Sequence, residues 1–370
     1  MNDVLDKVVI RSKIGIDGYI AHSKRKSLFL AVLLVLLVVT SIAVLKIDVG
    51  TITFSELARI VFDKESPLNE KVDVILVWNL YLPRIISGLL AGFVLGIAGA
   101  VMQCVLRNPL GSPYTLGISN AAAFGASLGI VALGGGMIVG QSHASIVINN
   151  PYLVTISAFS WSLIATGIII LLVKITKVSP ETMVLAGVAL SSIFSAGISM
   201  LQYIYNDYAL SAIVFWQFGS LGKAPWNELT ILAVVSSATI LYFLWKRWDY
   251  NALDAGDDVA RSLGIDVNWL RIITLFLAAL LTSVVVSFMG IIAFVGLLGP
   301  HIVRMFLGND HRYVLPGSMM LGAMILLLSD CIGQNLMAFT LPVGIITSFL
   351  GGPLFLYLLI RGYRRKKVEA

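Results

Sequence analysis

Charged residues are scarce in this sequence. Asp, Glu, Lys and Arg make up 12% of the 370 residues, apolar residues make up 58%, and the mean hydropathy is +0.91. A soluble domain carries charge on roughly 25% of its residues, so this composition excludes an ordinary soluble fold. We therefore expect a lipid bilayer as the solvent and one bundle of spanning helices of about 20 residues each.

Residues that bind metals or perform catalysis are also few. The two cysteines, Cys104 and Cys331, lie in apolar stretches without CxxC or Cys/His spacing, and the chain has four histidines. No HExxH or GxSxG motif occurs, and no nucleophile lies near a base in the sequence. The sequence therefore predicts inert cysteines, no metal site and no catalytic residue, which disfavours an intramembrane enzyme or a receptor-like scaffold.

A phosphate-binding loop is missing as well. No GxxxxGKS/T motif is present, and the Gly134–Gly136 run lacks the lysine that such a loop needs. No acidic residue lies at the centre of an apolar run, although a proton- or sodium-coupled carrier generally needs one there. These absences disfavour both ATP binding by this chain and secondary transport.

Apolar runs long enough to cross a bilayer dominate the chain. A shorter run, residues 209–218, predicts a surface or re-entrant helix. The first long run, preceded by Lys24–Lys26 and containing Ser41–Ala43, leaves a signal peptide as an alternative, although about 18 apolar residues is long for one. The predicted fold is an all-α polytopic membrane protein with about ten spans, near residues 28–45, 84–106, 114–133, 152–173, 182–205, 229–245, 269–289, 291–307, 314–331 and 343–360.

The basic residues predict the orientation. With ten spans, 20 of the 26 Lys and Arg residues fall on the side that holds both termini. The positive-inside rule makes that side the cytoplasm, so the net charge of +6 reflects a cell membrane rather than nucleic acid. The predicted organisation is a polar extension over residues 1–27, a transmembrane domain over 28–361 and a basic tail over 362–370.

One polar stretch between spans, residues 250–267, has the pattern of a short capped helix. Asp254 is predicted to cap its N-terminus, Asp257 and Asp258 to complement its dipole, and Gly264 to end it in a left-handed conformation. Because a plain linker needs no such signals, this pattern favours a docking element over a solvated loop.

Two further groups are candidates for a transport pathway. Small residues in the span over 182–205 predict either tight helix packing or a pathway lining, and the two are compatible. His301 and Arg304 share a helix face after Pro300 and predict either the inner mouth of a pathway or a lipid headgroup contact. The pathway candidates in the small-residue span are Gly187, Ser191, Ser192 and Ser195.

Several motifs occur together in an ordered series from about residue 80 to the C-terminus. The series resembles the FecCD-type permeases of binding-protein-dependent ABC importers, which carry iron-siderophores, haem and cobalamin. The motifs are LPRIISGLLAGFVLGIAGAVMQ (82–103), RNPLGSPYTLGIS (107–119), WQFGSL (216–221), NALDAGDDVARSLGI (251–265), GIIAFVGLLGPHIVR (290–304), GNDHR (308–312), LPVGIIT (341–347) and GGPLF (351–355).

This resemblance implies a type II ABC importer architecture. The expected assembly is a homodimer in membrane lipid with two ATPase subunits, which bind ATP and Mg, and an external substrate-binding protein. The chain itself is expected to be non-catalytic and to bind no cofactor. Iron-siderophore is the leading substrate, with haem or cobalamin as alternatives. The residues expected to contact the ATPase are Asp257, Ala260, Arg261, Ser262, Leu263 and Gly264.

Some positions depart from the family pattern at the outer side. Members often have two arginines around the start of the second span, and here Tyr81 replaces the first, whereas Arg84 keeps the second. Gln334 and Thr340 stand where an arginine and a glutamate are common. Arg84 is therefore the one candidate for docking the binding protein, and residues 1–27 lie outside the resemblance.

Overall fold

The protein is described by a computed structural model that covers residues 2–50, 52–63, 65, 71–139, 145–148, 150–176, 180–337 and 339–369. For residues 2–17, 19, 136–139, 145–148, 173–174, 176, 180–182, 208 and 358–369, the description extends to the backbone alone.

Helices account for nearly all of the described backbone. Seven are long and apolar enough to span a membrane, and three apolar helices are shorter, at Ile118–Val131, Val295–Leu307 and Val343–Tyr357. Together they match the ten predicted spans, so the all-α multi-pass fold is confirmed. The ten helices are α1 (Asn2–Val49), α4 (Leu82–Val105), α5 (Ile118–Val131), α6 (Pro151–Thr176), α7 (Pro180–Ile204), α9 (Trp226–Trp245), α12 (Val267–Met289), α13 (Val295–Leu307), α14 (His311–Asn335) and α15 (Val343–Glu369).

The connections add smaller elements. The run predicted as a surface or re-entrant helix is α8, and a two-stranded antiparallel hairpin, β1 with β2, is an addition that the sequence did not predict. The remaining elements are α2 (Phe54–Phe62), α3 (Lys71–Leu76), the π-helix η1 (Val77–Tyr81), β1 (Gly136–Val139), β2 (Ser145–Ile148), α8 (Asp207–Gln217), the 3-10 turn η2 (Leu221–Lys223), α10 (Arg247–Ala255) and α11 (Asp257–Ser262).

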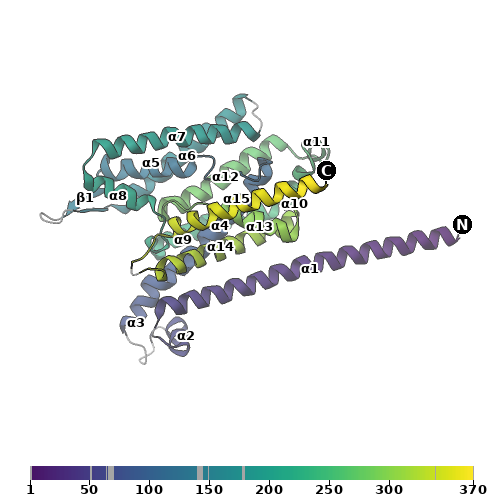
Figure 1. The fold of residues 1–370 in the computed structure, drawn as a ribbon, viewed down its shortest axis with the longest axis horizontal. Helices are drawn as coiled ribbons and strands as arrows, with labels where there is room; N and C mark the ends of the chain where they lie inside the picture. The colour runs from purple at the N-terminus through teal and green to yellow at the C-terminus, as the bar shows by residue number, and fades with distance from the viewer. Residues whose placement is uncertain are drawn as a thin grey trace.

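The bundle has two distinct ends (Figure 1). Helix α1 begins, and α15 finishes, at the end that carries α10 and α11, which we call the inner end. Helices α2, α3 and α8 and strand β1 lie at the opposite, outer end. Both termini therefore lie at one end of the bundle, as an even number of spans requires.

Helix α4 forms the centre of the bundle because its glycines admit neighbouring backbones. A Cβ atom added at Gly92 would lie 2.2 Å from the Cα of Ala323, and one added at Gly99 would lie 1.8 Å from the carbonyl oxygen of Gly296. Both contacts are shorter than side chains tolerate. Since lipid provides little hydrophobic drive between helices, this close backbone packing against α13 and α14 is a main source of their association.

The first apolar run has a place in this bundle. Helix α1 packs along α14, where Leu37 and Val44 are buried together with Ala323 and Leu327. The backbone helix is continuous across residue 27, so the predicted polar extension continues the first span without a break. The packing of α1 along α14 is expected of a membrane span rather than of a cleaved signal peptide.

The chain is non-helical between α12 and α13. Gly290 and Phe294 both have positive φ, at 81° and 66°. The freed backbone groups find partners in the segment after α8: Ile291 forms a β-bridge with Phe218, and the Ser220 N–H donates to the Met289 carbonyl at 2.8 Å. Irregular backbone is tolerated inside a membrane protein when its polar groups are paired in this way.

The glycine contacts of α4 give a stability prediction. Gly99→Ala should lower the free energy of unfolding by about 1–3 kcal/mol, because the methyl group would overlap a backbone carbonyl. Gly167→Ala in α6 is the matched control, because nothing lies within 4 Å of the added atom. The midpoint of thermal unfolding in detergent should fall for the first variant alone, and equal midpoints would contradict the packing described.

Candidate functional site

The stretch predicted as a docking element consists of two short helices, α10 and α11, that join α9 to α12. Helix α11 ends in a Schellman motif, in which the Gly264 N–H donates to the Arg261 carbonyl at 3.0 Å and the Ile265 N–H donates to the Ala260 carbonyl at 3.1 Å. Gly264 has a φ of +82°, which confirms its predicted left-handed stop. We call residues 247–266 the coupling segment.

The predicted role of Asp254 as an N-cap is wrong. Asp254 lies in the last turn of α10, and the residue before α11 is Gly256, whose extended, positive-φ conformation separates the two helices. The Asp254 carboxylate instead lies 3.0 Å from Nε2 of His311. Burial tends to raise the pKa of Asp254, but its hydrogen bonds with His311 and Cys104 and the nearby charges of His311 and Arg304 outweigh burial and lower it.

Asp257 connects the coupling segment to the spanning helices. Its carboxylate accepts two hydrogen bonds from the Arg271 guanidinium of α12, at 2.9 and 3.0 Å, and lies 2.5 Å from Nη2 of Arg107, just after α4. The arginines also donate to backbone carbonyls, Arg271 to Val105 and Arg107 to Leu253. The acidic start of α11 is thereby fixed to both α4 and α12.

The opposite face of α11 is exposed. Leu263 is 67% exposed and Val259 is 44% exposed, so apolar side chains protrude beside Arg261 at the inner end. An apolar group displayed among polar residues is typical of a surface that binds another protein. Of the six predicted ATPase contacts, Arg261, Ser262, Leu263 and Gly264 lie on this surface, whereas Asp257 and Ala260 face the bundle.

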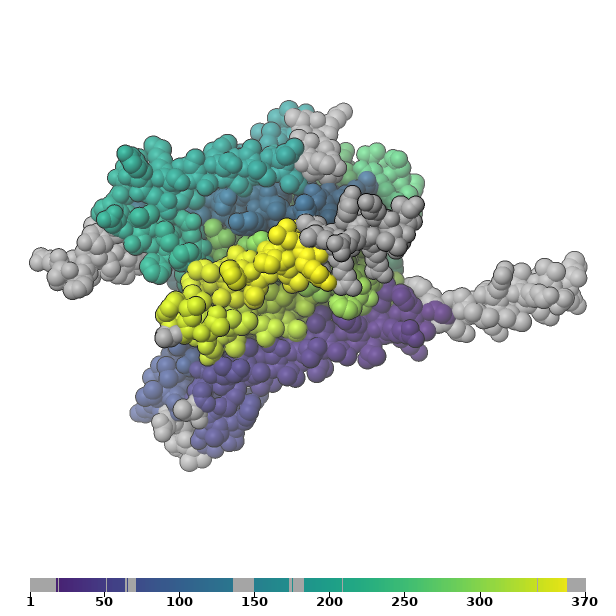
Figure 2. Space-filling model, in the orientation of Figure 1, coloured from purple at the N-terminus to yellow at the C-terminus, as the bar shows by residue number. Residues whose placement is uncertain are grey.

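The small residues of α7 divide between two faces. Gly187 is buried against the backbone of Thr115 and Leu116, and Ser191 is half-buried beside Gly117. Ser192 and Ser195 are exposed on the outside of the bundle, where α7 forms one edge (Figure 2). Tight helix packing therefore accounts for Gly187 and Ser191. Of the four predicted pathway residues, Ser192 and Ser195 are the two whose side chains are exposed and therefore free to contact lipid, a second protein or a pathway.

Arg84 is turned inward. Its guanidinium makes two hydrogen bonds, at 2.7 and 2.8 Å, with the Asp330 carboxylate of α14, and their side chains are only 12% and 3% exposed. The arginine is therefore engaged within the chain, and its role in docking a binding protein stays a prediction.

His301 and Arg304 line a cavity of about 540 Å³ at the inner end. Arg304 donates to the side-chain oxygen of Gln103 and, at 3.3 Å, to the carbonyl of Ala100. Its guanidinium therefore points into the protein, which agrees with an inner mouth better than with a lipid headgroup contact. Gln103, Arg107 and Asp254 line the same cavity.

Sequence reasoning missed two constellations at the inner end. One is the pairing of Asp257 with Arg107 and Arg271, and the other brings Cys104, Asp254 and His311 together. The members come from helices distant in the chain, so no local spacing signals them. The one available signal was that charges near the spans are scarce, so that Arg107 needs a reason for its position, and the sequence favoured a snorkelling or capping role for it over a partner.

Comparison with known proteins identifies the family of this chain. A profile of the FecCD transport family matches residues 33–361, which is most of the chain. The chain belongs to the FecCD transport family. A Methanocaldococcus jannaschii protein named as an ABC transporter permease, MJ0087, is 46% identical over 94% of this FecCD chain and 98% of its own length.

Two further relatives carry names that state a cargo. The hemin transport system permease protein HmuU of Yersinia pestis is 35% identical over 77% of this chain and 83% of its own. A solved structure described as an inward-facing metal-chelate type ABC transporter is 30% identical, covers 90% of this chain and 99% of its own, and has a TM-score of 0.75. This fold similarity confirms the expected permease architecture.

The pair between Arg84 and Asp330 gives a prediction. Arg84→Met should lower stability by about 3–5 kcal/mol, because it leaves the buried Asp330 carboxylate without its partner. Adding Asp330→Leu should restore most of that loss, since both charges are then gone.

The thermal midpoint of unfolding measures both changes. Asp258→Ala is the control, because its 3.9 Å pair with Arg261 lies at the surface and its loss should change the midpoint little. If the double variant is no more stable than Arg84→Met alone, the unpaired Asp330 carboxylate is not the cause of the lower thermal midpoint.

Proposed function

We propose that this chain is the membrane-spanning permease subunit of an ATP-driven importer for metal chelates. The observation that carries the proposal is the exposed surface of α11, with Leu263 and Val259 facing solvent, on a segment fixed to the bundle through Asp257. Membership of the FecCD family supports the same reading. Two copies of the chain would bind two ATPase subunits at the inner end and an external binding protein at the outer end.

The mechanism follows from the Asp257 connections. ATP and Mg bind to the partner ATPases, since this chain lacks a phosphate loop. Closure of the ATPases pushes on Arg261 and Leu263, and Asp257 passes the displacement to α4 and α12 through Arg107 and Arg271. The spans then tilt between outward and inward access, so the chain converts hydrolysis elsewhere into movement and has no catalytic role itself.

The pathway would run along the dimer interface. Ser192 and Ser195 expose small polar side chains on α7, which allow close approach of a second copy and contact with a polar cargo. At the inner end, His301 and Arg304 line the cavity into which cargo is released. No acidic residue lies at the centre of a span, which suits a bulky and nearly neutral chelate better than a coupling ion.

An iron-siderophore is the proposed cargo, and haem or cobalamin are the alternatives. The names of HmuU and of the metal-chelate type structure support a chelate in general. Uptake of labelled ferric siderophore, hemin and cobalamin, compared in cells with and without the gene, tests the choice. Loss of ferric siderophore uptake alone is the expected result. Loss of hemin uptake alone, or of cobalamin uptake alone, would identify that compound as the cargo instead.

The proposed location is the cytoplasmic membrane with both termini in the cytoplasm. With ten spans, 20 of the 26 basic residues are predicted on the side that holds the termini, and α1 begins and α15 finishes at the inner end (Figure 1). Because the basic residues concentrate on one side of the membrane, as the positive-inside rule predicts, we propose lipid and protein partners and no nucleic acid.

The assembly can be tested by purification. The affinity-tagged chain should copurify with an ATPase subunit in about equal amount, and vesicles containing both should take up cargo only when ATP is supplied. The same vesicles with a non-hydrolysable ATP analogue are the control. Uptake without ATP would indicate a secondary carrier and overturn the proposal.

The contact surface of α11 can be tested by substitution. Gly264→Pro should abolish uptake while leaving the protein in the membrane, because proline cannot adopt a φ of +82° and the end of α11 would be displaced. Arg261→Glu should do the same by reversing the charge that faces the ATPase.

Gly134→Pro is the matched control, since Gly134 has a φ of +77° and open surroundings at the outer end. ATP hydrolysis by the complex should continue in the two α11 variants without uptake. Normal uptake in both would place the ATPase contact elsewhere.

A further inference from the structure

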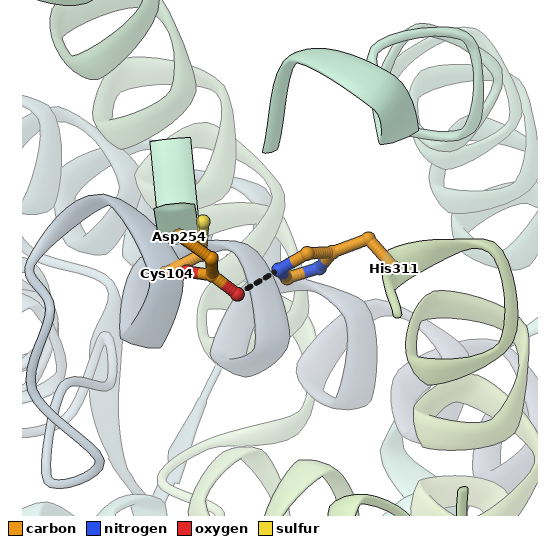
Figure 3. Close-up of side chains that lie close together, drawn as sticks. All are labelled: Cys104, Asp254 and His311. Carbon is orange, nitrogen blue, oxygen red and sulfur yellow. Dashed lines mark hydrogen bonds and ion pairs between the residues drawn. The ribbon is translucent and has the colours of Figure 1, made fainter. Parts of the chain in front are cut away.

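A cysteine, an aspartate and a histidine from three helices meet at the inner end (Figure 3). Cys104 comes from α4, Asp254 from α10 and His311 from α14, and one ligand atom of each lies within 4.8 Å of the other two. The Asp254 carboxylate lies 3.0 Å from Nε2 of His311. Cys104 and His311 are buried, and Asp254 is exposed, so the group has a protected interior and one side open to solvent.

The three side chains already contact one another without an ion. The Cys104 thiol donates to the Tyr250 carbonyl at 3.6 Å and also hydrogen-bonds the Asp254 carboxylate, which lies 3.0 Å from Nε2 of His311. Because Nε2 is the nitrogen that faces Asp254, an ion held between the three residues would bind there and replace these contacts. The closeness of three ligand atoms from three separate helices is the observation that supports an ion.

The donor set selects the class of ion. Thiolate, imidazole and carboxylate together suit Zn²⁺ and similar borderline transition metals rather than Mg²⁺ or Ca²⁺. Bond lengths of about 2.0–2.3 Å place tetrahedral ligands about 3.3–3.8 Å apart. The ligand atoms, which lie within 4.8 Å of one another, would therefore approach by up to about 1.5 Å, and the 3.0 Å pair of Asp254 and His311 would open slightly. Binding would release the Cys104 proton to solvent, and the resulting two negative charges would balance a divalent ion.

The cavity described above gives the ion a route and a fourth ligand. Both Cys104 and Asp254 line its wall, and its volume of about 540 Å³ is large enough for water. Two arginines also line it. Arg107 is paired with Asp257, whereas Arg304 binds the neutral Gln103 side chain and a backbone carbonyl and keeps its positive charge, which the two anionic ligands of the proposed site would face.

We propose that Cys104, Asp254 and His311 bind a divalent transition-metal ion of the zinc class that ties α10 to α4 and α14. Because α10 leads directly into α11, the ion holds the coupling segment in one position. As a consequence that rests on the proposed function, free metal arriving at the inner side slows further import.

Cobalt binding tests the site without transport or ATP. Metal-free protein in detergent is titrated with Co²⁺, whose bond to a thiolate gives a charge-transfer absorption band. One equivalent per chain should produce the band, and added Zn²⁺ should remove it. Cys104→Ser should lose the band, whereas Cys331→Ser, the matched control, should keep it because Cys331 lies in the last turns of α14.

A second variant, at Asp254, keeps the test decisive even if Cys104→Ser does not fold. Asp254→Asn keeps a hydrogen-bonding group beside His311 and should weaken Co²⁺ binding by at least about 10-fold. Zn²⁺ should also raise the thermal midpoint of the wild-type protein and of Cys331→Ser, but not that of Cys104→Ser. The absence of a band in the wild-type protein, or an unchanged band in Cys104→Ser, would overturn the site.

The regulatory consequence has its own measurement. Vesicles that contain the full complex should show ATP-driven uptake that Zn²⁺ on the inner side lowers in the wild type and in Cys331→Ser, but not in Cys104→Ser. Uptake equally sensitive in all three would overturn the regulatory role, and an absence of uptake in metal-free vesicles would count against the proposed function instead.

Discussion

The carboxylate of Asp257 is the point on which the inner end of this protein depends. It is shared by Arg107 and Arg271, so that one side chain joins the coupling segment to two spanning helices. Asp257 and Arg271 are partly buried and Arg107 is exposed, and a carboxylate held by several hydrogen bonds is bound more strongly and directionally than a single surface pair. This junction connects α11 itself to the spans, beside the contact that α10 makes through Asp254 and His311.

The junction works because the helices that it joins are themselves rigidly packed. The glycines of α4 bring its backbone against α13 and α14, so a push at the inner end of α4 displaces a block of helices rather than bending one. In our proposal, the exposed face of α11 receives the push and this block converts it into a change of access. The functional surface and the structural core are therefore linked by a few side chains.

The sequence predicted local features well and long-range contacts poorly. Hydropathy located the seven helices long enough to span a membrane and the three shorter apolar helices. Gly264 was predicted to have a left-handed conformation because few other residues adopt one, and its φ of +82° agrees. The role of Asp254 was predicted wrongly because aspartate is common both at a helix N-cap and in a pair with a residue distant in the sequence. The partners of Asp257 depend on how α11 packs against α12 and the end of α4, and the approach of His311 to Cys104 depends on how α4, α10 and α14 pack. No local spacing encodes either arrangement.

The central claim is that the coupling segment moves as one body with the inner end of α4 and the loop that follows it. Spin labels at Asp258 on α11 and Tyr114 in that loop, both exposed, measure this in the assembled complex after both native cysteines are replaced by serine and labelled protein is diluted with unlabelled chain. The account predicts an unchanged distance between the two labels within one protomer when ATP is added, while the distance between Asp258 labels across the dimer, measured on undiluted protein labelled at Asp258 alone, shifts. A nucleotide-dependent change within the protomer would contradict it.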